Sequence, residues 1–405
     1  MRPLDEAQAE VLAAIEPLGT ERIDLEEAVG RILGADVIAP HDVPPFPNSA
    51  MDGYAVRAVD LTGAPVMLRI LEDVPAGSVA TQPVVAGSAI KIMTGAPMPE
   101  GADTVVKVEV TRQAGDGHVE ILEPMARGTA VRPAGGDIVA GSVVLEEGAA
   151  IGAVEAALLA TAGVSKPIVG RRPRVAVMAT GDELRPPGTE VLEPGQIRES
   201  NRPLMRGLVA GAGGRVLDLG IVPDRQSELV AALERASEEA DAILTSGGVS
   251  MGEYDLIKKV LLERGTVDFW QVAMQPAKPF AFGHVGGVPL FGLPGNPVSV
   301  MVAFEQFARP ALLRMQGATD LFRPRIRVTM GETIETDPGK VVFVRVRLGA
   351  DDGAAYSSGG QSSNVLSALG AADGFAVVPV GTGIVSEGST VEVELFRHPA
   401  RSLRK

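Results

Sequence analysis

Hydrophobic and polar residues change their spacing several times along the chain, and each change predicts a change of structural type. Residues 4–36 carry apolar side chains at helical spacing and predict two helices, the second over about residues 25–33. Short β-branched runs, separated by glycine and proline, follow to about residue 133 and predict strands. An alanine-rich segment at 153–162 predicts a further helix.

Between residues 174 and 315, apolar strands alternate with amphipathic helices. The predicted strands begin with 174–179, 215–219 and 241–245, and the predicted helices are 202–210, 226–240, 254–264 and 298–315. This alternation is typical of a parallel, doubly wound sheet, in which ligands bind at the carboxyl ends of the strands. From about residue 322 the pattern becomes all-β. We therefore expect a multidomain protein of α/β and β parts around a central doubly wound parallel sheet.

The composition narrows the possible functions. The 405 residues include 37 basic and 51 acidic side chains, a formal net charge of −14, with no cysteine and four scattered histidines. The negative charge argues against broad nucleic-acid binding, because that mode needs Lys and Arg to neutralise phosphates. Without cysteine there is no disulfide framework, thiolate nucleophile or Cys-bound metal. Any metal is expected to be a hard cation held by oxygen ligands.

The N-terminus and the length of the apolar stretches predict where in the cell the protein is located. The N-terminus carries acidic residues where a signal peptide has an apolar core. The longest apolar stretches end short of the roughly 18–20 residues that cross a membrane. We expect a soluble, cytoplasmic protein with no membrane partner.

The string SGGVSMGEYD, residues 246–255, is the strongest local signal for chemistry. It follows an apolar strand and opens a helix, so its glycines can turn tightly and leave N–H groups free at a helix N-terminus, where anions bind. An ordinary strand-to-helix connection is the plain alternative, although Gly247, Gly248 and Gly252 are more glycines than a connection needs.

The same string also matches the nucleophile elbow of α/β-hydrolases, Gly-x-Ser-x-Gly, at residues 248–252. Ser250, Asp268 and His284 follow the chain order that a hydrolase triad requires. His284 lies in an apparent strand, however, and is more simply explained as a strand residue. A serine hydrolase is therefore the weaker alternative.

Two further loops at predicted strand ends carry acidic side chains. Asp182 and Glu183 follow the first strand in the string TGDEL, and Asp224 follows the next strand. Carboxylates beside a phosphate indicate a bridging Mg²⁺, because bare acids repel an anion. The alternative is that Asp182 caps a local turn and Asp224 the helix that follows.

Other loop residues add to this picture. Lys278 stands between prolines that hold the backbone extended, which favours a fixed phosphate contact, and Pro297 lies near the first position of a helix. Asp52, Thr94 and Asp137 lie in loops outside the α/β region. Each of these is weak evidence alone, since an Asp beside Gly is usually part of a turn.

Seven strings occur in one order between residues 48 and 299: NSAMDGYAVR, IMTGAPMPEGAD, TGDEL, GQIRESN, SGGVSMGEYD, PAKPFAFG and GLPGNPVS. Together they make the chain resemble the molybdopterin molybdenumtransferase family of the MoeA type, which is related to the E domain of gephyrin. The resemblance covers essentially the whole chain, with a looser match in the C-terminal β region.

The resemblance implies four domains and a homodimer. Residues 1–38 and 134–170 would form an elongated N-terminal domain, 39–133 an inserted β-rich domain, 171–318 the α/β molybdopterin-binding domain, and 319–405 a C-terminal β-barrel-like domain. In such homodimers the α/β domain of one subunit faces the inserted region of the other across a cleft. This arrangement would explain why loops distant in sequence resemble site loops.

The resemblance also implies a reaction: adenylyl-molybdopterin and molybdate react, with Mg²⁺ as cofactor, and AMP and molybdenum cofactor are released. The implied catalytic residues are Asp52, Glu183, Asp224, Asp255 and Lys278. The implied Mg²⁺ ligands are Asp52, Glu183 and Asp255. The implied substrate-binding residues are Thr94, Asp137, Thr180, Gly181, Ser246, Gly247, Gly248, Ser250, Pro294, Pro297, Arg345 and Ser363.

One string departs from the family pattern. The family often has Lys-Pro-Gly-Lys-Pro, whereas residues 275–279 read Gln-Pro-Ala-Lys-Pro, so one positive contact is missing and Arg198 or Lys107 would have to replace it. A scaffold that binds molybdopterin or an oxyanion without turnover is the remaining alternative. The sequence does not decide between molybdate and tungstate, because both are tetrahedral dianions of nearly equal size.

Overall fold

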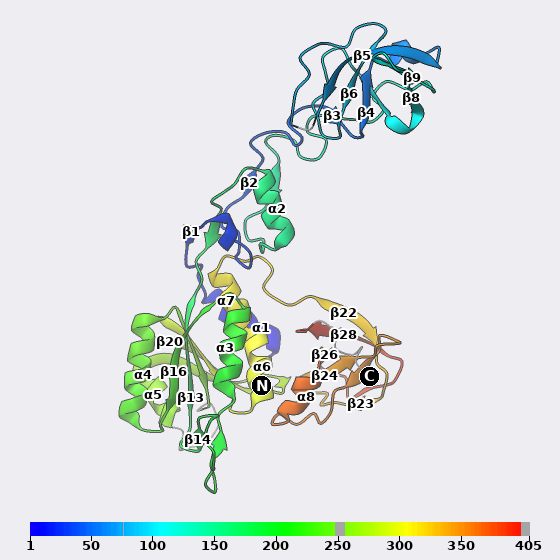
Figure 1. Cartoon of the computed structure of the whole chain (residues 1–405). Helices are drawn as coiled ribbons and strands as arrows, with labels where there is room; N and C mark the ends of the chain where they lie inside the picture. The colour runs from blue at the N-terminus through cyan, green and yellow to red at the C-terminus, as the bar shows by residue number, and fades with distance from the viewer. Residues whose placement is uncertain (76, 248–255, 398–405) are drawn as a thin grey trace. The chain divides into compact units, whose positions relative to one another are not determined.

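The computed structural model describes residues 1–75, 77–247 and 256–397. The chain divides into two compact units (Figure 1). One contains Met1–Ala35, Glu147–Gly152 and the chain from Pro167 onward, and we call it the large unit. The other, the small unit, contains Asp36–Glu146 and Ala153–Lys166. The predicted boundaries of four domains stay a prediction.

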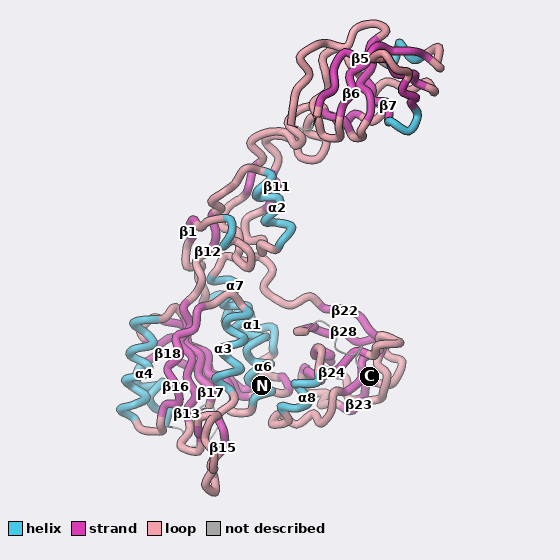
Figure 2. The backbone as a smooth tube through the Cα atoms, viewed as in Figure 1, coloured by secondary structure: helices cyan, strands magenta, loops and turns pink. Residues whose placement is uncertain are grey.

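The small unit is built mainly of strands and loops (Figure 2). Its main sheet has the order β7-β4-β6-β5-β9-β8, with bounds Thr104–Lys107, Gly53–Val56, Ser88–Ile92, Val66–Val74, His118–Ile121 and Thr111–Gln113. Two short antiparallel pairs join β3 (Asn48–Ser49) to β10 (Val131–Arg132) and β2 (Val37–Ile38) to β11 (Val143–Leu145), and one helix, α2, spans Ala153–Thr161. Alternation along β4 places Tyr54 and Val56 in one apolar cluster and Ala55 in another.

The large unit holds the central sheet, whose strand order is β16-β13-β17-β21-β20-β18. The bounds in this order are Arg215–Val222, Arg174–Thr180, Ala242–Ser246, Val288–Leu293, Pro279–Val285 and Gly265–Gln271. The first four strands are parallel, as predicted. Strand β20 is antiparallel to both of its neighbours, so the sheet is mixed and β18 runs in the same direction as the parallel set.

Helices cover both faces of this sheet (Figure 1). Their bounds are α1 Leu4–Ala13, α3 Asn201–Gly211, α4 Gln226–Glu239, α5 Leu256–Arg264, α6 Pro297–Ala303 and α7 Arg309–Met315. Along β13, Val175 and Val177 pack with α1, α3 and α6, whereas Ala176 and Met178 pack with α4 and α5. Because strand side chains alternate between faces, this pattern is the doubly wound arrangement that the sequence predicts.

The predicted helix over residues 25–33 is wrong, because only Leu25–Glu27 form a short 3₁₀ turn. Gly30 has a φ of +81°, in the left-handed region, which ends helical backbone at that point. The backbone N–H of Gly30 then bonds to the carbonyl of Ile151, and that of Leu33 bonds to Ala149. Distant chain segments therefore take the hydrogen bonds that a helix would have made. Nearby, β1 (Thr20–Arg22) pairs with β12 (Ile168–Gly170).

The C-terminal part of the large unit is β-rich, as predicted. Its sheet has the order β19-β24-β26-β28-β22, with bounds Met274–Gln275, Val341–Leu348, Gly374–Val378, Thr390–Leu395 and Arg325–Thr329. The smaller strands are β25 (Ala355–Ser357), β23 (Ile334–Glu335) and β27 (Ile384–Val385). A short helix, α8 (Leu366–Ala371), was not predicted. Strand β19 comes from the α/β region of the chain and pairs with β24, so it connects that region to the C-terminal sheet.

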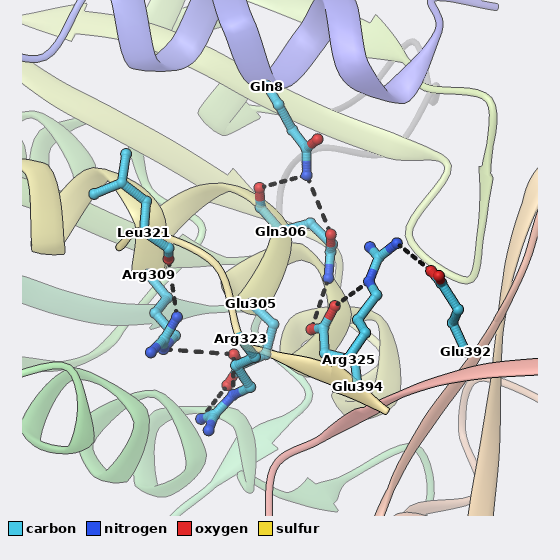
Figure 3. A network of polar contacts seen from close by, with 9 residues as sticks. All are labelled: Gln8, Glu305, Gln306, Arg309, Leu321, Arg323, Arg325, Glu392 and Glu394. Carbon is cyan, nitrogen blue, oxygen red and sulfur yellow. Dashed lines mark hydrogen bonds and ion pairs between the residues drawn. The ribbon is translucent and has the colours of Figure 1, made fainter. Parts of the chain in front are cut away.

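A polar network also links these two parts of the large unit (Figure 3). One turn of π-helix, η4 (Phe304–Ala308), lies between α6 and α7. Its Glu305 is 2% exposed and receives two hydrogen bonds from Arg323, at 2.7 and 3.0 Å. The Nε2 of Gln306 donates to Oε1 of Glu394 in β28 at 3.0 Å, while Gln8 of α1 donates to the Oε1 of Gln306 at 3.1 Å. Among the described residues, no helix is both long and apolar enough to cross a membrane.

Candidate active site

The carboxyl ends of the central parallel strands form one edge of the sheet, which we call the carboxyl edge. The register aligns Ala179, Ser246 and Leu293 across β13, β17 and β21. The residues that follow these positions, Thr180, Gly247 and Pro294, therefore lie side by side. All three belong to the predicted substrate-binding set, so the strand ends bring predicted residues together as the fold class implies.

Close packing at the carboxyl edge requires glycine at residue 247. Gly247 has a φ of +95°, and a Cβ there would lie 2.8 Å from the carbonyl oxygen of Thr180. Its N–H donates to the carbonyl of Leu293 at 3.2 Å, so the loop begins in a fixed position. Gly181, after β13, has a φ of +147°, and a Cβ there would meet the Glu183 carboxylate. These glycines allow backbone and acidic side chains to approach each other closely.

Ser246 is 2% exposed and connects three segments. Its Oγ accepts a hydrogen bond from Nδ2 of Asn201 at 2.7 Å and donates to the carbonyl of Pro294 at 3.4 Å. The same Nδ2 donates to the carbonyl of Gly295 at 2.6 Å. Sequence reasoning missed Asn201 as a site residue, although it closes the string GQIRESN.

Lys278 lies at the carboxyl edge as well. It precedes Pro279, which pairs with Gln271 where β18 ends, and its side chain is exposed. Asp337 lies nearby: a hydrogen bond from Lys340 at 2.6 Å, the N–H of Gly339 and the charge of Lys278 together hold the pKa of Asp337 below its usual value. The segment that carries Lys278 therefore sits where the α/β sheet meets the C-terminal sheet.

The predicted acids of the large unit that the structure describes lie on two neighbouring loops. Asp182 and Glu183 follow β13, and Asp224 follows β16, whose Val222 pairs with Thr180. The backbone N–H of Asp224 donates to Oδ1 of Asp182 at 3.2 Å. This bond joins the two loops, whose residues lie 42 apart in the sequence, and it is not the local turn cap that the alternative interpretation of Asp182 implies. The Glu183 carboxylate is exposed, while its carbonyl accepts from Ile197 at 2.9 Å and precedes the small parallel pair of β14 (Leu184–Arg185) and β15 (Ile197–Arg198).

The C-terminal sheet brings Arg345 and Ser363 toward the start of α6. Arg345 in β24 is 1% exposed, and its guanidinium donates to the carbonyls of Gly360 at 2.7 Å and Ser362 at 3.2 Å. Burial lowers the pKa of Arg345 below its usual value. Ser363 accepts at Oγ from Nδ2 of Asn296 at 2.9 Å. Asn296 is the N-cap of α6 and precedes Pro297, so this contact joins the two predicted loops.

The small unit holds the remaining predicted residues. The Asp52 carboxylate accepts two hydrogen bonds from Thr94, one from its N–H at 2.7 Å and one from its hydroxyl at 2.8 Å. These bonds lower the pKa of Asp52. Asp137 is exposed, and its backbone N–H donates to the carbonyl of Val43 at 3.0 Å. Of these three predicted residues, the structure therefore brings Asp52 and Thr94 into contact.

Three predicted residues, Gly248, Ser250 and Asp255, lie outside the described residues. Within residues 1–75, 77–247 and 256–397, no three acidic or histidine side chains gather closely enough to hold a metal ion. Because Asp255 lies outside the described residues, the predicted set of Asp52, Glu183 and Asp255 stays a prediction. Of the two cations expected to compensate for Gln275, Arg198 donates to the carbonyls of Thr189 and Glu190, and Lys107 lies in the small unit.

The strand register places His284, a residue of the alternative hydrolase triad. His284 in β20 pairs with Thr266 and Pro289, near the starts of β18 and β21. It therefore lies at the amino edge of the sheet, opposite to the edge where the loop after Ser246 begins. This placement supports the simpler interpretation of His284 as a strand residue.

Comparisons with known proteins agree with the fold. Three family profiles match successive parts of the chain: the MoeA N-terminal region (domain I and II) at residues 2–163, a probable molybdopterin binding domain at 176–314, and the MoeA C-terminal region (domain IV) at 327–396. A molybdopterin molybdenumtransferase 2 of Mycobacterium tuberculosis is 40% identical, covering 97% of this chain and 99% of that protein. A molybdopterin molybdenumtransferase of Haemophilus influenzae is 38% identical, covering 98% and 99%.

A solved structure is similar over the same length. The crystal structure of the molybdopterin biosynthesis moeA protein from Pyrococcus horikoshii OT3 has a TM-score of 0.86 and 31% identity, covering 98% of this chain and 100% of that one. The fold and its carboxyl edge thus define an α/β protein of the molybdopterin-binding class. The chain belongs to the MoeA family, whose members are transferases of molybdenum cofactor biosynthesis. The comparisons do not favour the hydrolase alternative.

Proposed function

We propose that this chain inserts molybdate into the dithiolene of adenylyl-molybdopterin and releases AMP and molybdenum cofactor. The observation that carries the proposal is Arg345. Its guanidinium is buried and donates to two backbone carbonyls, and among the described residues no acidic side chain pairs with it, so its positive charge is left without a counter-ion. A buried charge without a partner is costly, and a bound anion offsets that cost.

The surroundings of Arg345 suit a phosphate or an oxyanion. Ser363 follows the carbonyls that Arg345 contacts, and it meets the N-terminus of α6, where backbone N–H groups favour negative charge. Lys278 adds a positive charge at the same carboxyl edge. Donors fixed before the substrate arrives stabilise charge that develops during cleavage of a pyrophosphate-type linkage. The chain's residues would therefore bind and orient the two substrates, and side chains would form few bonds themselves.

We also propose Mg²⁺ as the metal, with Asp52, Glu183 and Asp255 as ligands. Carboxylate oxygens are ligands that Mg²⁺ prefers. Asp255 lies outside the described residues, and the described residues alone do not bring three such ligands together, so the reaction is described without a step through the ion. Removal of divalent cations by a chelator should abolish the reaction, and added Mg²⁺ should restore it. A rate unchanged by the chelator would contradict this assignment.

A homodimer and a cytoplasmic location complete the proposal. In the dimer, the site at the carboxyl edge of one subunit would be completed by Asp52, Thr94 and Asp137 of the other. The support is the same family membership, together with the presence of predicted acids on both units of the chain.

The test is a single-turnover assay with purified protein and adenylyl-molybdopterin. AMP should be released in an amount equal to the enzyme-bound substrate when molybdate is added, and only slowly without it. Tight binding of substrate without AMP release would indicate the scaffold alternative. Parallel reactions with tungstate would show whether the site discriminates between the two oxyanions.

A further inference from the structure

The string GQIRESN contains a residue, Asn201, to which the proposed reaction assigns no role. Its last residue, Asn201, is the first residue of α3. Glu199, two residues earlier, is 3% exposed and accepts a hydrogen bond at Oε1 from the N–H of Arg202 at 2.6 Å. This bond satisfies one of the free N–H groups at the start of the helix. It therefore fixes the first turn of α3, from which the Asn201 side chain extends.

The side-chain amide of Asn201 joins two loops of the carboxyl edge. Its Nδ2 lies 2.7 Å from Oγ of Ser246 and 2.6 Å from the carbonyl of Gly295. A carbonyl only accepts hydrogen bonds, so the nitrogen and not the oxygen of the amide must face Gly295. The orientation of the amide follows from this partner. Both donated protons of the amide are thereby used to connect the end of β17 with the turn before α6.

The oxygen of the Asn201 side-chain amide has no partner among the residues that the structure describes. The Oδ1 of Asn201 is buried and accepts no hydrogen bond from the described residues. A buried acceptor without a donor costs free energy, because the hydrogen bonds it would make to water are lost. This free-energy cost falls on Asn201, at the carboxyl edge.

We propose that Asn201 is a positioning residue for the substrate site. It holds the Ser246–Gly247 turn and the turn at residues 294–297 at a fixed separation, so that both contact the substrate together. The inference rests on the proposed function, because it assumes that these two turns bind the substrate. Loss of the link should weaken substrate binding more than it slows the reacting step.

The test compares Asn201→Ala, Asn201→Asp and Asn201→Ser with the wild-type protein. Loss of two hydrogen bonds should raise the KM for adenylyl-molybdopterin by about tenfold, while kcat changes by less than about twofold. Asn201→Asp keeps the shape but cannot donate, so it should resemble Asn201→Ala. Asn201→Ser retains one donor and should recover part of the affinity. Gln226→Glu, which adds the same charge at the first residue of α4, should leave KM unchanged.

Hydrogen exchange gives a second readout that does not depend on turnover. Amides of Gly247, Gly295 and Asn296 should exchange faster in Asn201→Ala and in Asn201→Asp, while exchange in the strands stays unchanged. An unchanged KM, or unchanged exchange at these amides, would overturn the proposal. If wild-type protein releases no AMP, the proposed function fails, and the exchange result alone then decides whether Asn201 links the two turns. If Asn201→Ala does not fold, Asn201→Asp and Asn201→Ser provide the same comparison.

Discussion

At the scale of single residues, hydrogen bonds lower the pKa of one candidate acid, Asp52. The Asp52 carboxylate is held by two donors of one residue, the N–H and the hydroxyl of Thr94, at 2.7 and 2.8 Å. Donors to the ionised form favour it, so these bonds lower the pKa of Asp52. The carboxylate therefore stays charged and in a fixed orientation.

Thr94→Val should raise the pKa of Asp52 toward its ordinary value, because the hydroxyl donor is lost. The N–H donor remains, so part of the lowering should remain as well. A pH titration of the Asp52 carboxyl carbon by NMR measures this change. Thr62→Val, whose hydroxyl bonds to the carbonyl of Val59 and to no acid, is the matched control. An Asp52 titration identical in Thr94→Val and wild type would contradict the account.

The pKa of Glu394 changes in the opposite direction to that of Asp52. Its burial raises its pKa, although Arg325 and the bond from Gln306 act in the other direction. A carboxyl with a folded-state pKa above the unfolded one binds its proton more tightly in the folded state. The free energy of unfolding should therefore fall as pH rises from about 4.3 through the raised pKa.

Glu394→Gln removes this titration while keeping an acceptor for Gln306. The stability of the variant relative to wild type should therefore increase as pH rises through the same window. Urea unfolding of both proteins at a series of pH values measures the difference. A difference that does not change with pH would show that burial of Glu394 has no such effect.

At the scale of secondary-structure elements, the carboxyl edge depends on backbone that only glycine adopts easily. Gly247→Ala should destabilise the protein by about 1–2 kcal/mol from the positive φ alone, with a further cost from the approach to Thr180. Gly188→Ala is the control, since a Cβ there meets nothing within 4 Å and φ is not left-handed. Chemical unfolding measures both. Equal effects of the two substitutions would contradict the packing argument.

Elements with strong periodicity were predictable from the sequence, and contacts between distant elements were not. The strand and helix alternation of residues 174–315 is local, because each strand carries its own apolar run. The helix expected at 25–33 failed because Ile151 and Ala149 take the backbone bonds of that segment. Glycine-rich strings in the sequence were enough to identify the loops of the candidate site. Asn201 and Asp337 escaped notice, since their significance depends on which loops the fold brings beside them.

At the scale of the whole molecule, the proposed shared site predicts a dimer with twice the 42.0 kDa mass of one chain. Light scattering measures this mass. A sharper result should come from mixing two variants of strongly reduced activity, Asp52→Ala and Glu183→Ala. If each site takes Asp52 from one subunit and Glu183 from the other, a mixed dimer has one intact site. Random exchange of subunits should then restore about a quarter of the wild-type rate. No recovery after verified exchange would place both residues in one subunit's site or outside it.

The release of AMP from adenylyl-molybdopterin on addition of molybdate tests the central claim most directly, when wild type is measured beside Glu183→Ala and Asp52→Ala. We expect rapid molybdate-dependent release by the wild-type protein. Each variant should be slower by about tenfold or more, as for loss of a charged group that orients substrate. Rates unchanged in both variants would contradict the assignment of the carboxyl edge and its acidic loops as the active site.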